Sequence, residues 1–126
     1  MVDMLQQASD WLQDQRVQYA SRPVTYQRGV DSVEVQATIG ETVFRINDAY
    51  GAEIRHVRRD YLILTSDLVL DGQPTLPQRG DRIREQADGV TYVHEVMGPG
   101  SNEPDWRYSD SYRKALRIHT KQVGTE

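Results

Sequence analysis

The sequence predicts a mainly β fold, a small β-barrel or sandwich of about six to seven strands preceded by an N-terminal amphipathic helix. Three observations carry this prediction. Residues 79–97 have the pattern of a β-hairpin, residues 31–39 alternate strictly between apolar and polar side chains, and residues 61–64 form a contiguous apolar run. The barrel is expected over residues 24–120 of a single domain, residues 1–126.

The hairpin RGDRIREQADGVTYVHEVM is the stretch around which the chain is organised. Asp88 and Gly89 form its predicted turn, because a two-residue turn needs positive φ and glycine adopts it without steric cost. The return strand, residues 90–97, is rich in β-branched and aromatic residues and has apolar side chains on both faces. This pattern predicts a strand that is covered on both sides.

Composition limits the classes of function. The chain has no cysteine, so neither a disulfide framework nor a thiolate metal site is expected, and a reducing compartment fits. We find no apolar run long enough to span a membrane and no signal peptide, so no membrane partner is expected. The net charge of −4 disfavours a protein that grips nucleic acid through its phosphates.

Residues 3–21 predict the amphipathic helix. Asp3 is the expected N-cap, with Gln6 as its capping-box partner, and Pro23 ends the helix. The helix either lays its apolar stripe on the barrel or docks on a neighbouring subunit. The stripe consists of Met4, Leu5, Ala8, Trp11, Leu12 and Tyr19.

Two strands are predicted next. Residues 24–28 form a short strand, and Gly29 turns the chain. In residues 31–39 the side chains of Val33, Val35, Ala37 and Ile39 face one way and the polar ones face the other, which predicts a half-buried strand.

Residues 40–51, GETVFRINDAYG, fit two interpretations. The segment is either an ordinary hairpin tip, with Val43, Phe44 and Ile46 packed on the barrel, or a projecting loop that contacts a partner. Residues 53–65 then predict one long strand, or two short strands broken at residues 58–60. The arginines Arg55, Arg58 and Arg59 are expected on a solvated face, because acids offset them.

The remaining connections are expected to be irregular. Residues 66–70 predict a helical turn, and residues 71–78 predict a loop. The Arg79-Gly80-Asp81 tripeptide matches a cell-adhesion motif, but we reject that interpretation because Gly80 and Asp81 simply turn the chain into a strand. Residues 97–110 predict a Gly/Pro-rich loop in which Trp106 and Tyr108 either cap the barrel or anchor an interface. The last strand is predicted at 113–120 and a frayed tail at 121–126.

No catalytic signature is present. The three histidines, His56, His94 and His119, fall on different predicted strands without ligand spacing, and His94-Glu95 lacks the second histidine of a zinc-protease motif. The acidic residues are expected to be solvated. We therefore predict no enzyme, with no catalytic residues, cofactor or metal.

The order of features resembles the head–tail connector (neck) proteins of tailed bacteriophages, of the head-completion, stopper or head–tail joining type. The resemblance covers residues 33–121 and the leading helix, and it rests on VEVQATIG, RRDYLIL, PQRGDRI, GVTYVHEV and DWRYSDSYRKALRIHTK. It implies a homo-oligomeric ring in the virion neck, assembled in the host cytoplasm, that meets portal or adaptor and tail proteins. Genome DNA would pass through its channel without specific binding, and residues 40–51 would project into that channel and help to retain the genome.

These expectations give a set of candidate interface residues and three alternatives to the neck-ring function. Exposed edge strands at 31–39 and 113–120 are expected to pair between subunits. The alternatives are a tail-completion protein or a nucleic-acid-binding OB-like barrel that uses Tyr61, Tyr92 and the arginine cluster; a hydrolase that uses the histidines is a third class. The candidate interface residues are Phe44, Arg45, Tyr50, Trp106, Tyr108 and Trp11.

Overall fold

The computed structural model describes residues 21–99 and 103–126. The predicted helix at 3–21, with Trp11, lies outside the described residues apart from Ser21, which begins the first strand. The described chain is mainly β, as predicted. Its strands are β1 (Ser21–Arg28), β2 (Asp31–Asn47), β3 (Glu53–Leu64), β4 (Val69–Leu70), β5 (Gln73–Pro74), β6 (Arg82–Ala87), β7 (Val90–Val96), β8 (Trp106–Tyr108) and β9 (Ala115–Thr125), with a 3-10 turn η1 at Thr65–Asp67.

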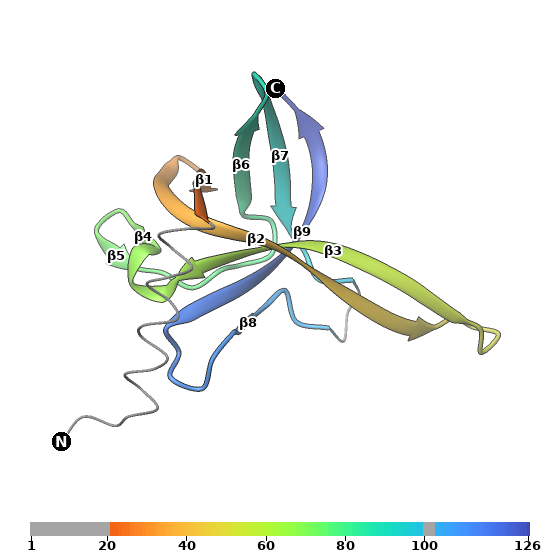
Figure 1. The fold of residues 1–126 in the computed structure, drawn as a ribbon. Coiled ribbons are helices and arrows are strands. Elements are labelled where there is room, and N and C mark those ends of the chain that lie inside the picture. Colours follow the sequence, from red (N-terminus) through yellow and green to blue (C-terminus); the bar gives the residue numbers. More distant parts are fainter. Residues whose placement is uncertain (1–20, 100–102) are drawn as a thin grey trace.

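The strands close into a barrel. The main sheet has the order β3-β2-β1-β6-β7-β9-β8, and β3 also pairs with β9, which joins the two ends of the sheet. One stretch of β9 pairs with β3 from Ala115 to Thr120, and the following stretch pairs with β7 from Thr120 to Thr125. Figure 1 shows β9 running past β3 and then upward beside β7. Because β9 joins both partners in turn, closure removes most open edges.

The core lies where the inward faces of these strands meet. Tyr26 and Tyr61 are the largest of its fully buried side chains. Burial of each large side chain contributes about 1.5–3 kcal/mol relative to exposure. The cluster consists of Val24, Tyr26, Val35, Ala37, Tyr61, Ile63, Leu68, Leu70, Ile83, Val96, Leu116 and Ile118.

The hairpin predicted at 79–97 is β6–β7. Asp88 and Gly89 have φ of 52° and 78°, so both central turn residues are left-handed, as in the turn that matches the twist of paired strands. The alternation predicted at 31–39 is also confirmed, because Val35 and Ala37 are buried while Glu34 and Gln36 are exposed. Residues 31–36 pair only with β1 among the described residues, so one edge is open there as predicted, whereas Ala37 and Thr38 are paired on both sides by β1 and β3.

Residues 40–51 continue a single long hairpin. β2 runs to Asn47, and β3 begins at Glu53 and is unbroken at 58–60. Pairing of β2 with β1 ends at Thr38, and pairing of β3 with β9 ends at Arg59. Beyond these points the two strands pair only with each other among the described residues. We call residues 42–58 the arm, and Figure 1 shows it extending away from the barrel.

The C-terminal half departs from prediction in two places. Trp106–Tyr108, expected in a loop, form β8, which pairs with Leu116, Arg117 and Ile118 of β9. Residues 121–125, expected to be a frayed tail, belong to β9, because β7 supplies a partner strand for them and Glu126 exchanges backbone hydrogen bonds with Thr91. The open edge predicted at residues 113–120 is wrong for the start of β9, since β3 and β8 flank it. Local sequence contains no signal for these nonlocal pairings.

Candidate assembly surfaces

Glu85 of β6 is buried at the mouth of the barrel and joins three strands. Its carboxylate accepts hydrogen bonds from Arg59 Nη2 at 2.7 and 2.8 Å and from the Tyr61 hydroxyl at 2.7 Å, both on β3. Arg22 of β1 adds a third contact at 3.0 Å. Burial would raise the pKa of Glu85, but the hydrogen bonds from Tyr61 and Arg59 outweigh it, so the pKa lies below its ordinary value. Glu85 is therefore ionised and holds β1, β3 and β6 together at the mouth of the barrel.

Asp60 of β3 is fully buried at the base of the arm. Arg117 donates to it at 2.6 Å, the His119 ring nitrogen Nδ1 lies at 2.8 Å, and the Thr42 hydroxyl donates to it as well. Burial raises the pKa of Asp60, but the hydrogen bonds from His119, Thr42 and Arg117 lower it by more. The pKa of Asp60 therefore lies below its ordinary value. The network ties β2, β3 and β9 together where the arm leaves the barrel.

Asp81, the acid of the Arg79-Gly80-Asp81 tripeptide, is also buried. It accepts the Tyr26 hydroxyl and a bidentate pair of hydrogen bonds from Arg28, at 2.9 and 2.7 Å. Burial and the bond to Asp81 raise the pKa of Tyr26 well above its ordinary range, so that hydroxyl stays protonated. An aspartate used in this way is not presented to an adhesion receptor.

The expectation that the acids are solvated is thus wrong for Asp60, Asp81 and Glu85. A period-2 signal was available for two of them, because Asp81 and Glu85 share a face with Ile83, which is fully buried. Asp60 gave no such signal, since it directly precedes an apolar run.

The arginine cluster is divided between the two faces of β3. Arg59 holds Glu85, whereas Arg55 is exposed on the same face of the strand and Arg58 points to the opposite face. The prediction of a solvated face holds for Arg55 alone. Tyr61 is buried with its hydroxyl on Glu85, so it is not available to stack on a nucleic-acid base.

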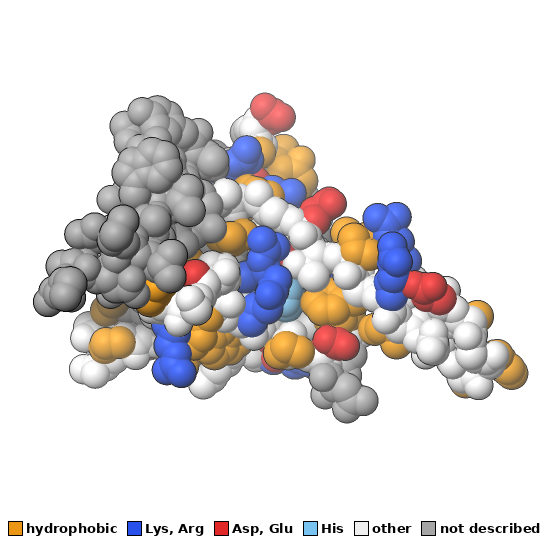
Figure 2. Space-filling model, turned by 60° about the horizontal axis from the view of Figure 1, so that its bottom comes forward, with side chains coloured by type: hydrophobic (Ala, Val, Ile, Leu, Met, Phe, Trp, Pro, Cys, Tyr) orange, Lys and Arg blue, Asp and Glu red, His pale blue; other side chains and the backbone are white. Residues whose placement is uncertain are grey.

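The arm brings three of the predicted interface residues together. Phe44 packs edge-on against His119, with ring centroids 5.0 Å apart. Arg45 is exposed beside Glu53, and Tyr50 is 97% exposed in the turn at the tip. The Asp48 carboxylate orders this turn by accepting the backbone N–H groups of Tyr50 and Ala52, each at 2.8 Å. Figure 2 shows hydrophobic and charged side chains interspersed along the arm.

Trp106 and Tyr108 of β8 form a second group. Their rings meet edge-on at 5.2 Å, and both side chains pack half-buried against the core cluster. Arg113 lies over the Tyr108 ring at 5.5 Å. This placement fits the barrel-capping interpretation, and a role in an interface stays a prediction for both. Trp11, the sixth predicted residue, lies outside the described residues.

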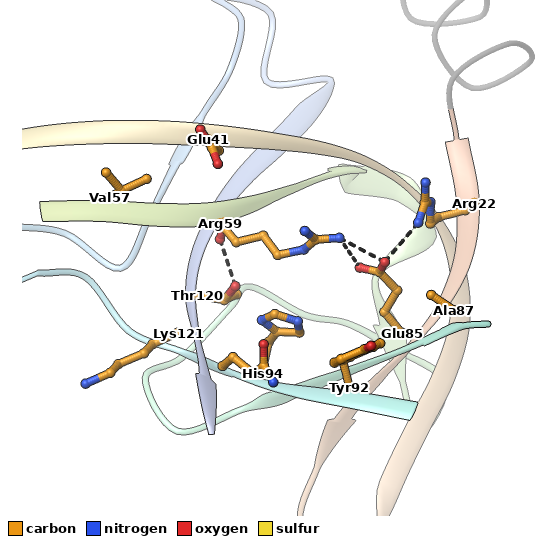
Figure 3. A pocket seen from close by; sticks show the side chains of 11 residues that line it. Arg22, Glu41, Val57, Arg59, Glu85, Ala87, Tyr92, His94, Thr120 and Lys121 are labelled. Atoms are coloured by element: carbon orange, nitrogen blue, oxygen red, sulfur yellow. Dashed lines mark hydrogen bonds and ion pairs between the residues drawn. The ribbon is translucent and has the colours of Figure 1, made fainter. Parts of the chain in front are cut away.

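A cleft opens at the mouth of the barrel beside the arm, with a volume of about 520 Å³. Figure 3 shows the Arg59–Glu85–Arg22 contacts and the His94 ring converging on it. This cleft could not be predicted from local sequence patterns, because its walls are strands distant in the chain. Its lining is Arg22, Glu41, Val57, Arg59, Glu85, Ala87, Tyr92, His94, Thr120, Lys121 and Gln122.

The histidines occupy separate environments. His119 lies on Asp60, His94 packs edge-on against Tyr61 at 5.5 Å, and His56 lies on the arm opposite Phe44. Over residues 21–99 and 103–126 no group of three or more histidine, aspartate and glutamate side chains is arranged to hold a metal ion. Within the same ranges no helix has the length and apolar character to cross a bilayer.

The described chain therefore combines a braced barrel with an arm, an aromatic edge strand and a cleft. The family model for phage head-tail joining proteins matches residues 2–126, so the chain belongs to that family of virion neck proteins. No curated protein matches the sequence.

Proposed function

We propose that the chain is a subunit of a ring in the phage neck, which joins the DNA-filled head to the tail and helps to retain or gate the genome. The subunit acts as a building block rather than an enzyme. Its partners are further copies of itself, portal or adaptor proteins on one side and tail proteins on the other. The observation that carries the proposal is the arm, in a chain that belongs to the head-tail joining family.

The arm has the features of an element that awaits a partner. Both of its outer edges lack a strand partner among the described residues, and Val43, Ile54 and Val57 on it are exposed. Isolated two-stranded hairpins are marginal in water, and proteins usually protect open edges. An arm that stays unpaired in the single copy therefore favours pairing or packing in an assembly.

The arm also suits a role in the channel. Seven residues of β2, from 41 to 47, extend about 23 Å at the rise of a β-strand. The tip then presents Tyr50 rather than a basic cluster. With a net charge of −4, a ring of such subunits would let DNA slide past without trapping it.

The OB-like nucleic-acid alternative is less well supported. Base stacking on a barrel needs exposed aromatic rings beside basic groups. Tyr61 is fully buried and Arg59 is committed to Glu85, which leaves Tyr92 and Arg55 on separate elements.

A shortened arm tests the role in genome retention. Residues 46–54 are replaced by Asn-Gly, which joins the directly opposed Arg45 and Arg55 through a tight turn and keeps the Phe44–His119 contact. We expect a folded protein whose particles assemble necks but lose packaged DNA, measured by nuclease-sensitive DNA and infectious titre.

The matched control replaces Val30 with Thr in the exposed β1–β2 turn, at a side chain 97% exposed. That change should leave titre and DNA content unaltered. Wild-type DNA retention in particles with the shortened arm would contradict the retention role, and a neck without this chain would contradict the ring.

A further inference from the structure

The cleft lies between two strand edges that have no strand partner among the residues that the structure describes. β3 and β9 are paired up to Arg59 and Thr120, and they then diverge. Past that point residues 53–58 of β3 pair only with β2, and residues 121–125 of β9 pair only with β7, within the part of the chain that the structure describes. Figure 1 shows the two strands diverging, and the cleft lies between these stretches, because its lining includes Val57 of β3 and Gln122 of β9.

Among the described residues, one buried polar atom of the cleft lacks a hydrogen-bond partner, and one exposed carboxylate there lacks an ion-pair partner. His94 is only 4% exposed, yet its ring atom Nδ1 has no hydrogen-bond partner among the described residues. Leaving such a buried group unpaired costs about 1–3 kcal/mol. The Glu41 carboxylate, which also lines the cleft, has no ion-pair partner within the described ranges. The unpaired buried nitrogen of His94 indicates that something polar enters the cleft in the functional state.

The arm carries the complementary features. Beyond Thr38 the outer edge of β2 has no strand partner among the described residues. Val43 on this edge is 40% exposed, and Val123 on the corresponding edge of β9 is 45% exposed. Arg55 lies directly opposite Arg45, a like-charged cross-strand pair that is unfavourable in a single copy. Arg55 has no ion-pair partner in residues 21–99 and 103–126. Its positive charge is complementary to the negative charge of Glu41 in the cleft.

One chain therefore holds both halves of a contact that it does not make with itself. The arm points away from the barrel, whereas the cleft lies at its mouth beside the arm's base. A contact between two different surfaces of identical copies is heterologous, and such contacts form a ring when the rotation from copy to copy closes.

We infer that the arm of one copy lies in the cleft of the next, with the outer edge of its β2 added to the open edge of β9 at residues 121–125. The occupant is a second copy of this chain. Arg55 of the arm approaches Glu41, and the polar backbone of the added strand supplies a partner for His94. This contact rests on the proposed ring, for which it names the interface between subunits, and it leaves the arm tip free beyond the cleft.

Cysteine cross-linking tests the contact directly, because the natural chain has no cysteine. Full-length Val43→Cys and Val123→Cys chains, one of them tagged, are mixed, assembled and treated with a short thiol-specific cross-linker. We expect a covalent heterodimer, seen as one band of summed mass. The control pairs Val123→Cys with Val30→Cys, whose side chain is 97% exposed and lies in the β1–β2 turn, and should give no heterodimer.

A charge reversal sharpens the result. Arg55→Glu on the Val43→Cys chain should largely abolish the cross-linked product, whereas Arg82→Glu, at an exposed position on β6, should not change its yield. Light scattering on the same samples reports assembly separately. Rings without the heterodimer would overturn the arm-in-cleft contact and leave the proposed ring standing. A chain that stays monomeric at every concentration and in the presence of its neck partners would overturn both.

Discussion

Single residues fix how the strands of the barrel meet. Glu85 joins β6 to β1 and β3, and Asp60 joins β3 to β2 and β9. Because each carboxylate accepts several hydrogen bonds from charged or hydroxyl donors, each is held ionised out of water. These contacts fix the two places where the barrel changes shape, its mouth and the base of the arm.

Replacing Asp60 with Asn tests the anchor of the arm. The variant keeps the shape but leaves Arg117 and His119 without their carboxylate, so we expect the free energy of unfolding to fall by about 3 kcal/mol. Urea unfolding followed by circular dichroism measures it. Glu34→Gln, at an exposed site on β2, should change stability by less than about 0.5 kcal/mol and serves as the control.

The pH dependence of stability follows from the same groups. The pKa values of Asp60 and Glu85 lie below their ordinary 3.8 and 4.5, so their contribution is complete above those values and is lost as pH falls through the lowered ones. Burial and nearby Arg59 lower the pKa of His94 below 6.5, so the unfolded chain takes up that proton first. The cleft that His94 lines also contains the charged side chains of Glu85 and Lys121.

We therefore expect urea unfolding to show a first loss of stability below pH 6.5 and a steeper loss below pH 4.5. His94→Gln should remove the first loss and keep the second. If His94→Gln and the parent chain show the same pH profile from 6.5 to 4.5, the account of His94 is wrong.

Among the structural elements, the connection that leads into β8 is held by close backbone packing. A Cβ on Gly98 would come within 2.6 Å of the Pro104 carbonyl oxygen, and the Gly98 N–H donates to Asp105 at 2.7 Å. Because the obstructing atom belongs to the backbone, relief requires the whole connection to shift.

Gly98→Ala should accordingly lower stability by about 1–3 kcal/mol, as overpacking does. Gly124→Ala is the matched control: nothing lies within 4 Å of its Cβ position in β9, and the change should be neutral. Thermal unfolding of both variants measures the difference, and equal melting temperatures would show that the connection adapts freely.

The elements differ in how far sequence alone predicts them. Local patterns sufficed for the strand at 31–39 and for the hairpin around Asp88-Gly89, because alternation and turn chemistry act over a few residues. In contrast, β8 and the end of β9 depend on which distant strand lies alongside, and the start of the arm depends on where β1 and β9 stop flanking β2 and β3. The cleft and two of its features, the unpaired His94 nitrogen and the open edge at 121–125, arise only when the barrel closes and its strands diverge.

At the scale of the whole molecule, the barrel is a closed and braced body, while the arm and the opening beside β9 leave edges unpaired. Closure of the barrel pairs strand edges that would otherwise promote aggregation. Among the described residues, the arm and residues 121–125 of β9 have unpaired edges beside the mouth, and these are the surfaces through which we propose that copies meet. Membership of the head-tail joining family indicates a location in the virion neck for the chain.

Cryo-electron microscopy of the intact phage neck tests the central claim most directly. We predict density for this chain as a closed ring of identical copies around the genome channel, between the head and the tail. Density for the chain outside the neck, or as single copies without contacts to one another, would contradict it.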